Sequence, residues 1–248
     1  MPSTNPPYLA GVRIVPERIP AEGGFPFTLP FVPLLELKFN AAVTFFTGEN
    51  GSGKSTMLEA IAALCGFPVS GGGPNELSDG HGPEQGSILS RALRPHFRRQ
   101  PPDGYFLRAE FHAHFASLLD ARAADPDFAG NAYGRYGGRS LHACLEGEAF
   151  LALLQNRVGR GLYLLDEPES ALSPQRQLFL PGLMDELVKD GATQFIVATH
   201  SPILMTYPEA EILSFDDPKL ERVSLEDTAH FRVTSRMLRD RETYWKEL

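Results

Sequence analysis

The chain has 248 residues, of which 42% are hydrophobic and 22% are charged, and its formal net charge is −8. This composition excludes disordered, collagen-like and coiled-coil chains, and the acidic balance argues against non-specific nucleic-acid binding. The two cysteines, Cys65 and Cys144, lie far apart and favour a reducing compartment. No apolar run reaches the roughly 20 residues that span a bilayer, and the first residues lack signal-peptide features. We therefore expect a cytoplasmic protein without direct membrane insertion.

Apolar patterns in the first part of the chain predict three strands and a helix. We expect the Pro-rich residues 1–10 to be disordered. Alternating apolar residues at Leu34–Asn40 predict a half-exposed strand, in an antiparallel layer with Gly11–Val15. The wholly apolar Ala42–Thr47 predicts a strand covered on both faces. Helical spacing of apolar residues then predicts a helix over Met57–Gly66.

The middle of the chain is less regular. Residues 70–104 are predicted to be a loop and a basic insert, Tyr105–Phe111 a strand, and residues 112–158 a helical subregion with helices at Ala113–Ala123 and Glu148–Val158. A solvated face is the ordinary explanation of the basic run, and contact with a phosphate backbone or an acidic partner is the alternative. Its basic residues are Arg91, Arg94, His96, Arg98 and Arg99.

In the second half, strands alternate with helices. Strands are predicted at Leu162–Leu165 and Gln194–Thr199, with a helix at Gln175–Lys189 between them. This alternation predicts βαβ units and therefore a parallel sheet. We expect a single α/β domain over residues 1–248, with an additional antiparallel layer. The last predicted elements are strands at Ala210–Phe215 and Leu220–Leu225 and a charged helix at Arg232–Leu248.

A glycine-rich motif lies between the first buried strand and its helix, and it matches G-x-x-x-x-G-K-[S/T]. Its glycines allow successive N–H groups to surround a phosphate, and the helix adds positive charge at its N-terminus. We expect Lys54 to reach the β- and γ-phosphates and Ser55 to ligate Mg²⁺. A glycine-rich turn without function is the alternative, which the flanking strand and helix disfavour. The motif comprises Gly48, Glu49, Asn50, Gly51, Ser52, Gly53, Lys54 and Ser55, and Thr56 follows it.

Polar residues follow two later strands at the sheet edge where phosphates bind. Asp166 and Glu167 end one apolar strand, and we expect Asp166 to hold Mg²⁺ and Glu167 to orient and deprotonate the attacking water. An acidic helix N-cap is the alternative explanation of this pair. His200 ends the next strand, where its ring N–H could contact the γ-phosphate.

These three elements together resemble an ABC-type ATPase, and most closely the small soluble prokaryotic ATPases called the AAA family. That family is similar to the nucleotide-binding heads of SMC proteins and transporters. The resemblance runs from about Phe31 to Phe215 and implies a P-loop NTPase fold of ABC type, with ATP and Mg²⁺ as ligands. It implies that Gly48–Thr56 is the Walker A loop, that Leu162–Glu167 is the Walker B strand, and that His200 is the switch histidine.

The chain departs from the family at two motifs. The signature motif should start the helix before Walker B and bind the γ-phosphate on the opposite subunit of a head-to-tail dimer. Gly147 and Glu148 fit it, but Leu145 replaces its serine and Glu146 adds a negative charge beside a phosphate. We therefore expect weaker ATP-dependent dimerisation or slow hydrolysis without a partner. The D-loop, which begins at Ser170, ends in Ser173 where the family usually has Asp.

Two other family positions lack a clean counterpart. Glu110 is the candidate for the Q-loop ligand of Mg²⁺ and water, and an ion pair with Arg108 is its alternative role. Tyr8, Phe25 and Phe27 are candidates for stacking on adenine, although an aromatic in the core or at the surface is the ordinary explanation of each.

The resemblance implies Mg-dependent ATP hydrolysis that drives a switch for an unidentified protein partner, in DNA maintenance or in defence. Only about 110 residues separate Lys54 from Asp166, which leaves no room for a long coiled-coil arm. One alternative is the nucleotide-binding subunit of an ABC transporter. Another is a nucleotide-binding regulator with little hydrolysis, and nucleic-acid binding stays a minority alternative.

Overall fold

A six-stranded sheet forms the centre of the computed structural model, in the order β5-β6-β7-β3-β8-β9. The first five strands are parallel, and β9 pairs with β8 in the antiparallel sense. The structure describes residues 6–74, 85–108, 120–125, 130–131, 133–134, 138, 140, 151 and 154–247. The strands are β3 (Val43–Thr47), β5 (Gly104–Arg108), β6 (Gly161–Asp166), β7 (Thr193–Ala198), β8 (Glu211–Ser214) and β9 (Glu221–Val223).

A second, three-stranded antiparallel sheet has the order β2-β1-β4, which confirms the predicted additional layer. Its strands are β1 (Leu9–Ile14), β2 (Glu36–Lys38) and β4 (Leu93–Phe97). Two expectations differ from this arrangement. The strand β1 begins within the segment that we expected to be disordered, and β4 lies within the expected loop and basic insert.

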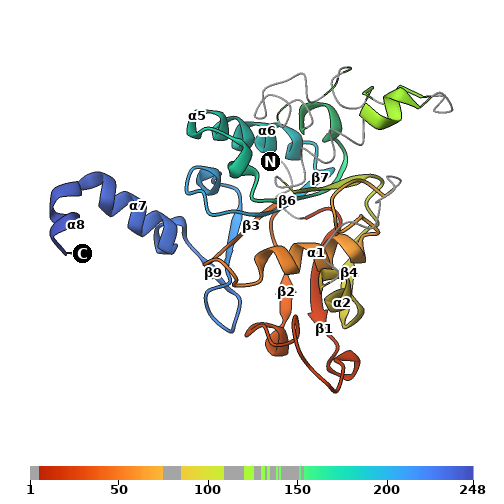
Figure 1. Ribbon diagram of the computed structural model, residues 1–248, viewed down its shortest axis with the longest axis horizontal. Coiled ribbons are helices and arrows are strands. Elements are labelled where there is room, and N and C mark those ends of the chain that lie inside the picture. The colour runs from red at the N-terminus through yellow and green to blue at the C-terminus, as the bar shows by residue number, and fades with distance from the viewer. Residues whose placement is uncertain are drawn as a thin grey trace.

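Helices cover both faces of the central sheet. On one face α1 (Lys54–Leu64) lies between the two sheets, and on the other α6 (Phe179–Val188) packs against β7 (Figure 1). The helix predicted at 175–189 is divided at Leu178 into α5 (Pro174–Gln177) and α6. Short helix α2 (Gln85–Arg91) precedes β4. None of the helices among the described residues is long and apolar enough to cross a bilayer.

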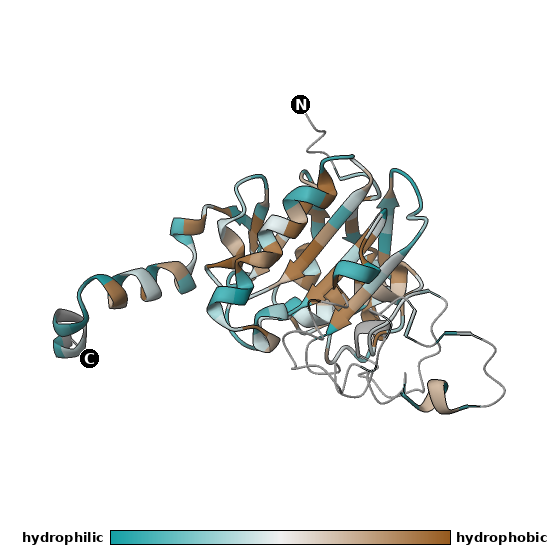
Figure 2. Ribbon diagram, turned by 90° about the horizontal axis from the view of Figure 1, so that it is seen from above, coloured by the Kyte–Doolittle hydropathy of each residue, from teal (hydrophilic) through white to brown (hydrophobic). Residues whose placement is uncertain are grey.

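The C-terminal helices α7 (Ala229–Arg239) and α8 (Arg241–Glu247) extend away from the two sheets in both ribbon views (Figures 1 and 2). The charged helix predicted at 232–248 is thus two helices, which meet at Asp240, and the first of them begins three residues earlier than expected. No residue of α7 is buried. The first turn of this arm, which carries His230, contacts the site described below.

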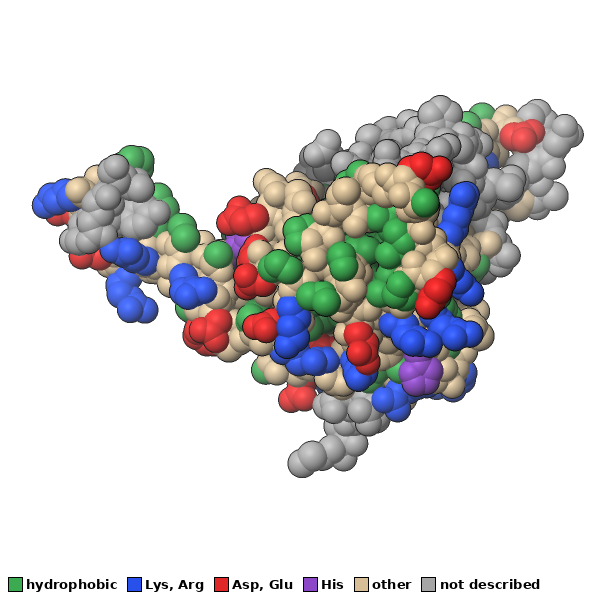
Figure 3. Space-filling view, turned by 90° about the horizontal axis from the view of Figure 1, so that it is seen from below, with side chains coloured by type: hydrophobic (Ala, Val, Ile, Leu, Met, Phe, Trp, Pro, Cys, Tyr) green, Lys and Arg blue, Asp and Glu red, His purple; other side chains and the backbone are tan. Residues whose placement is uncertain are grey.

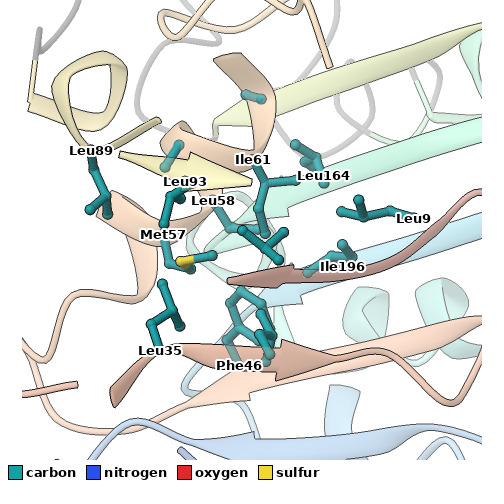
Figure 4. Packing of buried hydrophobic residues seen from close by; sticks show 14 of the residues in the cluster. Leu9, Leu35, Phe46, Met57, Leu58, Ile61, Leu89, Leu93, Leu164 and Ile196 are labelled. Carbon is teal, nitrogen blue, oxygen red and sulfur yellow. The ribbon is translucent and has the colours of Figure 1, made fainter. Parts of the chain in front are cut away.

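The core is divided between the two faces of the central sheet, because successive side chains of a strand point to opposite faces. Phe46, Leu164 and Ile196 contact α1 on one face, and Phe45 and Phe195 belong to the cluster beneath α6. Figure 4 shows the first cluster, in which side chains of α1 meet those of both sheets. Both faces of β3 are buried, as its wholly apolar sequence predicted.

A buried glutamine joins the two sheets. The Gln194 side chain on β7 accepts hydrogen bonds from the backbone N–H groups of Tyr8 (3.2 Å) and Leu9 (2.9 Å) and donates one to the Leu9 carbonyl (2.9 Å). The Tyr8 hydroxyl donates to the carbonyl of Ala192, before the start of β7. Tyr8 is therefore a core residue at the opposite end of β7 from the predicted phosphate site, and its proposed role in stacking on adenine is wrong.

The predicted arginine-rich run lies at the surface. All five of its basic residues are exposed. Two of them, Arg94 and His96, lie on β4, and Leu93 at the start of this strand is buried. Figure 3 shows Lys and Arg side chains gathered around a histidine on one face of the molecule. The Arg99 guanidinium lies over the Tyr8 ring, 5.0 Å from its centroid. A solvated face with one cation–π contact accounts for these positions.

Candidate nucleotide-binding site

The glycine-rich loop that we expect to be the Walker A loop connects β3 to α1, and its glycines have backbone conformations that other residues rarely adopt. The φ angles of Gly48, Gly51 and Gly53 are 145°, 79° and 98°. A Cβ atom at Gly53 would lie 2.7 Å from the Phe31 ring and 3.0 Å from Leu29. Position 53 therefore requires a glycine, both because φ is positive and because the side chains of Phe31 and Leu29 leave no room for a Cβ atom.

The Lys54 side chain lies within this loop and is only 4% exposed. Its ammonium donates hydrogen bonds to the carbonyls of Gly48 (2.7 Å) and Glu49 (3.0 Å). Burial lowers the pKa of Lys54, and the carboxylates of Glu167 and Asp166 oppose that shift. The loop therefore holds a buried cation beside backbone N–H groups, an arrangement suited to an anion of high charge.

Ser55 and Asp166 meet between α1 and the end of β6. The Ser55 hydroxyl donates a hydrogen bond of 2.9 Å to Asp166 Oδ1. A hydroxyl and a carboxylate oxygen are the hard donors that Mg²⁺ prefers, so the pair fits the expected ion. No cluster of three or more His, Cys, Asp or Glu side chains able to hold a metal occurs among the described residues. Phosphate oxygens and water would complete the shell, as is usual for Mg²⁺.

Arg108 is a residue of this site that the sequence motifs did not indicate. It lies at the end of β5, directly opposite Asp166 in the register of β5 and β6. Its guanidinium lies 2.6 Å from Glu59 Oε1 and 3.5 Å from Asp166 Oδ2, and all three side chains are buried. The place of Arg108 beside Asp166 depends on the pairing of β5 with β6, which the sequence motifs do not indicate.

Asp216 is a second residue that sequence reasoning missed. It follows β8 and accepts a hydrogen bond of 2.7 Å from the backbone N–H of Glu49, inside the Walker A loop. Its other carboxylate oxygen accepts a bond of 3.2 Å from the Ser214 hydroxyl. Because β8 lies next to β3, this carboxylate supports the loop from the side. An acid directly after the strand predicted at Ala210–Phe215 was the available signal.

Glu167 follows Asp166 in an unusual backbone conformation. It is the one non-glycine residue of the described chain with positive φ, at 49°, and its N–H donates to the carbonyl of Ala198 on β7. The Ser170 hydroxyl donates a hydrogen bond of 2.9 Å to the Glu167 carbonyl. The Glu167 side chain is 45% exposed. Non-glycine residues held in this region cluster at functional sites, where the surrounding structure fixes them.

His200 lies after β7, the strand that pairs in parallel with β6, and next to Glu167. Its Nε2 is 3.5 Å from Glu167 Oε1, and its backbone N–H donates to Glu169 Oε1 at 2.6 Å. Burial, followed by the charges of Lys54 and His230, lowers the pKa of His200, and Glu167 opposes this shift. Burial also raises the pKa of Glu169. The lowered pKa favours the neutral form of the His200 ring.

The D-loop residue Ser173 has a structural partner. Its hydroxyl accepts a hydrogen bond from the backbone N–H of Arg176 and so caps α5. Nearby, the Ser201 hydroxyl donates to Gln177 Oε1 (2.6 Å), and Gln177 Nε2 donates to the Leu172 carbonyl (3.1 Å). The segment that follows His200 is thus hydrogen-bonded to the segment that follows Glu167.

Of the remaining adenine candidates, Phe27 is buried in the core, and Phe25 is 55% exposed. Only Phe25 thus has a ring free to stack. The other expected residues lie outside the described part of the chain, and their predicted roles stay predictions. These residues are Glu110, Leu145, Glu146, Gly147 and Glu148.

Two family models match separate segments of the chain. Residues 148–206 match a model described as "AAA domain, putative AbiEii toxin, Type IV TA system", and residues 30–98 match a second AAA-domain model. The second segment contains the Walker A loop, and the first contains Asp166, Glu167 and His200. No curated protein sequence matches the chain.

The fold is shared with solved ATP-binding domains. A chain of "a putative metal-chelate type ABC transporter" in an inward-facing conformation matches with a TM-score of 0.55 at 16% identity, over 92% of this chain and 88% of that one. The ADP form of MJ1267, an ATP-binding cassette of an ABC transporter, matches with a TM-score of 0.50 at 14% identity, over 92% and 98%. An SMC head from Thermotoga maritima has 17% identity over 76% and 92%, with a TM-score of only 0.41. The chain thus has the fold of ATP-binding domains of the ABC type, and two of its segments match AAA-domain family models.

Proposed function

We propose that the chain binds Mg-ATP and hydrolyses it, and that the cycle serves as a switch for a protein partner. The observation that carries this proposal is the hydrogen bond of 2.9 Å between Ser55 and Asp166, beside the buried ammonium of Lys54. Residues 111 positions apart in the sequence thus bring hydroxyl, carboxylate and ammonium groups to one glycine-rich loop. This is the combination that Mg²⁺ and a triphosphate require.

Each group has a definite task in this reaction. The N–H groups of the Walker A loop and Lys54 bind the β- and γ-phosphates, while Asp216 keeps the loop in shape. Ser55 and Asp166 would hold Mg²⁺, which would offset the negative charge of the phosphates. Glu167 orients the attacking water and accepts its proton. The Nε2 side of His200, which faces Glu167, is directed to the γ-phosphate.

We further propose that two chains associate head to tail around two ATP molecules. The side chain of Glu167 is 45% exposed. The site of a single chain therefore does not exclude bulk water from the place where the attacking water would bind. Exclusion of water strengthens the electrostatic interactions of an active site. A second subunit that covers Glu167 would supply that exclusion.

The test is Mg-ATP turnover per molecule, measured over a range of protein concentrations. We expect the specific rate to rise with concentration, because the site is completed by a second copy. Glu167→Gln should bind ATP normally and lose at least about 100-fold in turnover, since general-base catalysis is removed. The matched control, Glu221→Gln, changes an exposed acid on β9 and should leave the rate unchanged.

Strong residual hydrolysis in Glu167→Gln would contradict the role of Glu167. Tight ATP binding with no turnover at any concentration would instead favour the regulator with little hydrolysis. Association with a membrane subunit during purification would favour the transporter alternative. Failure of the wild-type chain to bind Mg-ATP would overturn the proposal itself.

A further inference from the structure

A second histidine contacts the site from the C-terminal arm. His230 is the second residue of α7, and its position is fixed by the start of that helix. The Thr228 hydroxyl caps the helix by accepting a hydrogen bond of 3.2 Å from the N–H of Phe231, and it donates one of 2.7 Å to the Leu225 carbonyl. The first turn of α7 is therefore held in place although the rest of the arm is exposed.

The rings of His200 and His230 form a hydrogen-bonded pair. His200 Nδ1 lies 2.8 Å from His230 Nε2, and the ring centroids are 4.7 Å apart at an interplanar angle of 64°. The two outer nitrogens, His200 Nε2 and His230 Nδ1, are buried and have no hydrogen-bond partner among the described residues. Glu167 Oε1, at 3.5 Å, lies just beyond hydrogen-bond distance of His200 Nε2.

Glu167 determines which nitrogens of this pair carry protons. A neutral imidazole has one N–H donor and one acceptor nitrogen. If the lone pair of His200 were on Nε2, it would face the Glu167 carboxylate and be repelled, so the proton lies on Nε2. His200 Nδ1 must then accept, and His230 Nε2 must donate. This order leaves His230 Nδ1 as an acceptor without a partner among the described residues.

We propose that His230 is a positioning residue that holds the His200 ring with its Nε2–H group directed at Glu167 and the γ-phosphate. This inference rests on the proposed ATPase function and adds to it a residue on the C-terminal arm. Without the His230 donor, the proton of His200 could move to Nδ1 and the ring could rotate. Because His230 acts through His200, its loss should lower kcat far more than it raises KM.

A pair of substitutions separates the donor from the size of the ring. His230→Gln retains an N–H donor at a similar distance along the side chain, and His230→Met has a similar volume without a donor. The first readout is the ¹⁵N shifts of the His200 ring in the nucleotide-free protein, assigned by their loss in His200→Gln. We expect protonated Nε2 and unprotonated Nδ1 in the wild type and in His230→Gln, and a mixture of tautomers in His230→Met.

The second readout is steady-state ATP hydrolysis. A single hydrogen bond changes an equilibrium by roughly three- to tenfold, so we expect kcat of His230→Met to fall by about that factor with KM nearly unchanged. His230→Gln should recover most of the lost rate. The matched control is His96→Met, which alters an exposed histidine on β4 and should behave as wild type.

Wild-type ¹⁵N shifts and wild-type kcat in His230→Met would overturn the proposal, as would equal losses in the Gln and Met variants. If His230→Met fails to fold, His230→Asn replaces it, because the shorter Asn amide cannot reach His200. Absence of hydrolysis in the wild type would count against the proposed function alone, and the ¹⁵N shifts would still decide whether His230 sets the His200 tautomer.

Discussion

Buried charges around the proposed magnesium site give the first prediction at the scale of single residues. Replacing Arg108 with Met removes the guanidinium from Glu59 and Asp166, both of which are buried. Breaking a buried ion pair leaves charge that water cannot solvate, so we expect a loss of about 3 kcal/mol in the free energy of unfolding. Urea unfolding measures this loss, and the affinity for Mg-ATP should fall with it because Asp166 loses a support.

The matched control is Lys38→Met. Lys38 also lies beside a carboxylate, that of Glu36 at 2.8 Å, but both side chains are well exposed. Exposed ion pairs contribute little, so urea unfolding of this variant should match the wild type. Equal effects of the two substitutions would contradict the importance that we assign to burial.

The residues that sequence motifs identified are those whose role depends on local spacing. Lys54 and Ser55 occupy fixed positions in one short motif, and Asp166 follows an unmistakable apolar strand. Arg108 and Asp216 could not be assigned in this way, since each acts on a residue distant in the sequence. Their places depend on strand order and register, which propensity and periodicity do not determine.

At the scale of elements, substitution by alanine should change stability in opposite directions at two glycines, one at the N-terminus of α1 and one within α6. Gly53→Ala should destabilise the protein by about 2 kcal/mol and abolish ATP binding, because φ is 98° and the new methyl group would meet the Phe31 ring. Gly182→Ala should stabilise it by about 1 kcal/mol, since this position lies within α6 with open space around it. Thermal unfolding of both variants measures the difference, and a loss of stability in both would contradict the prediction.

Elements were predictable where the hydrophobic pattern is continuous, as in β3 and β6, which are buried on both faces. The strand β4 was missed because Arg94, Pro95 and His96 give it a sequence typical of a loop. Its strand conformation comes instead from pairing with β1, which is a tertiary interaction. The helix α7 begins earlier than expected for a local reason, because Thr228 caps its N-terminus. The prediction was based on the charged residues and did not take this cap into account.

At the scale of the whole molecule, both ends of the chain contact β7 or the segment that follows it. Gln194 joins the N-terminal strand to β7, and β7 ends just before His200. At the other end of the chain, His230 contacts His200 from the C-terminal arm. The strand β7 and His200 thus contact parts of the chain that carry none of the expected nucleotide-binding motifs.

The last prediction concerns association. If two chains enclose two ATP molecules, blocking hydrolysis should trap the pair, so Glu167→Gln should sediment as a dimer with Mg-ATP and as a monomer with Mg-ADP. Lys54→Ala, which lacks the phosphate-binding ammonium, should stay monomeric with either nucleotide. Because Leu145 and Glu146 depart from the signature motif, the substitutions Leu145→Ser and Glu146→His should increase the dimer fraction and raise wild-type turnover. Identical sedimentation in ATP and ADP for every variant would show that ATP does not drive association of this chain.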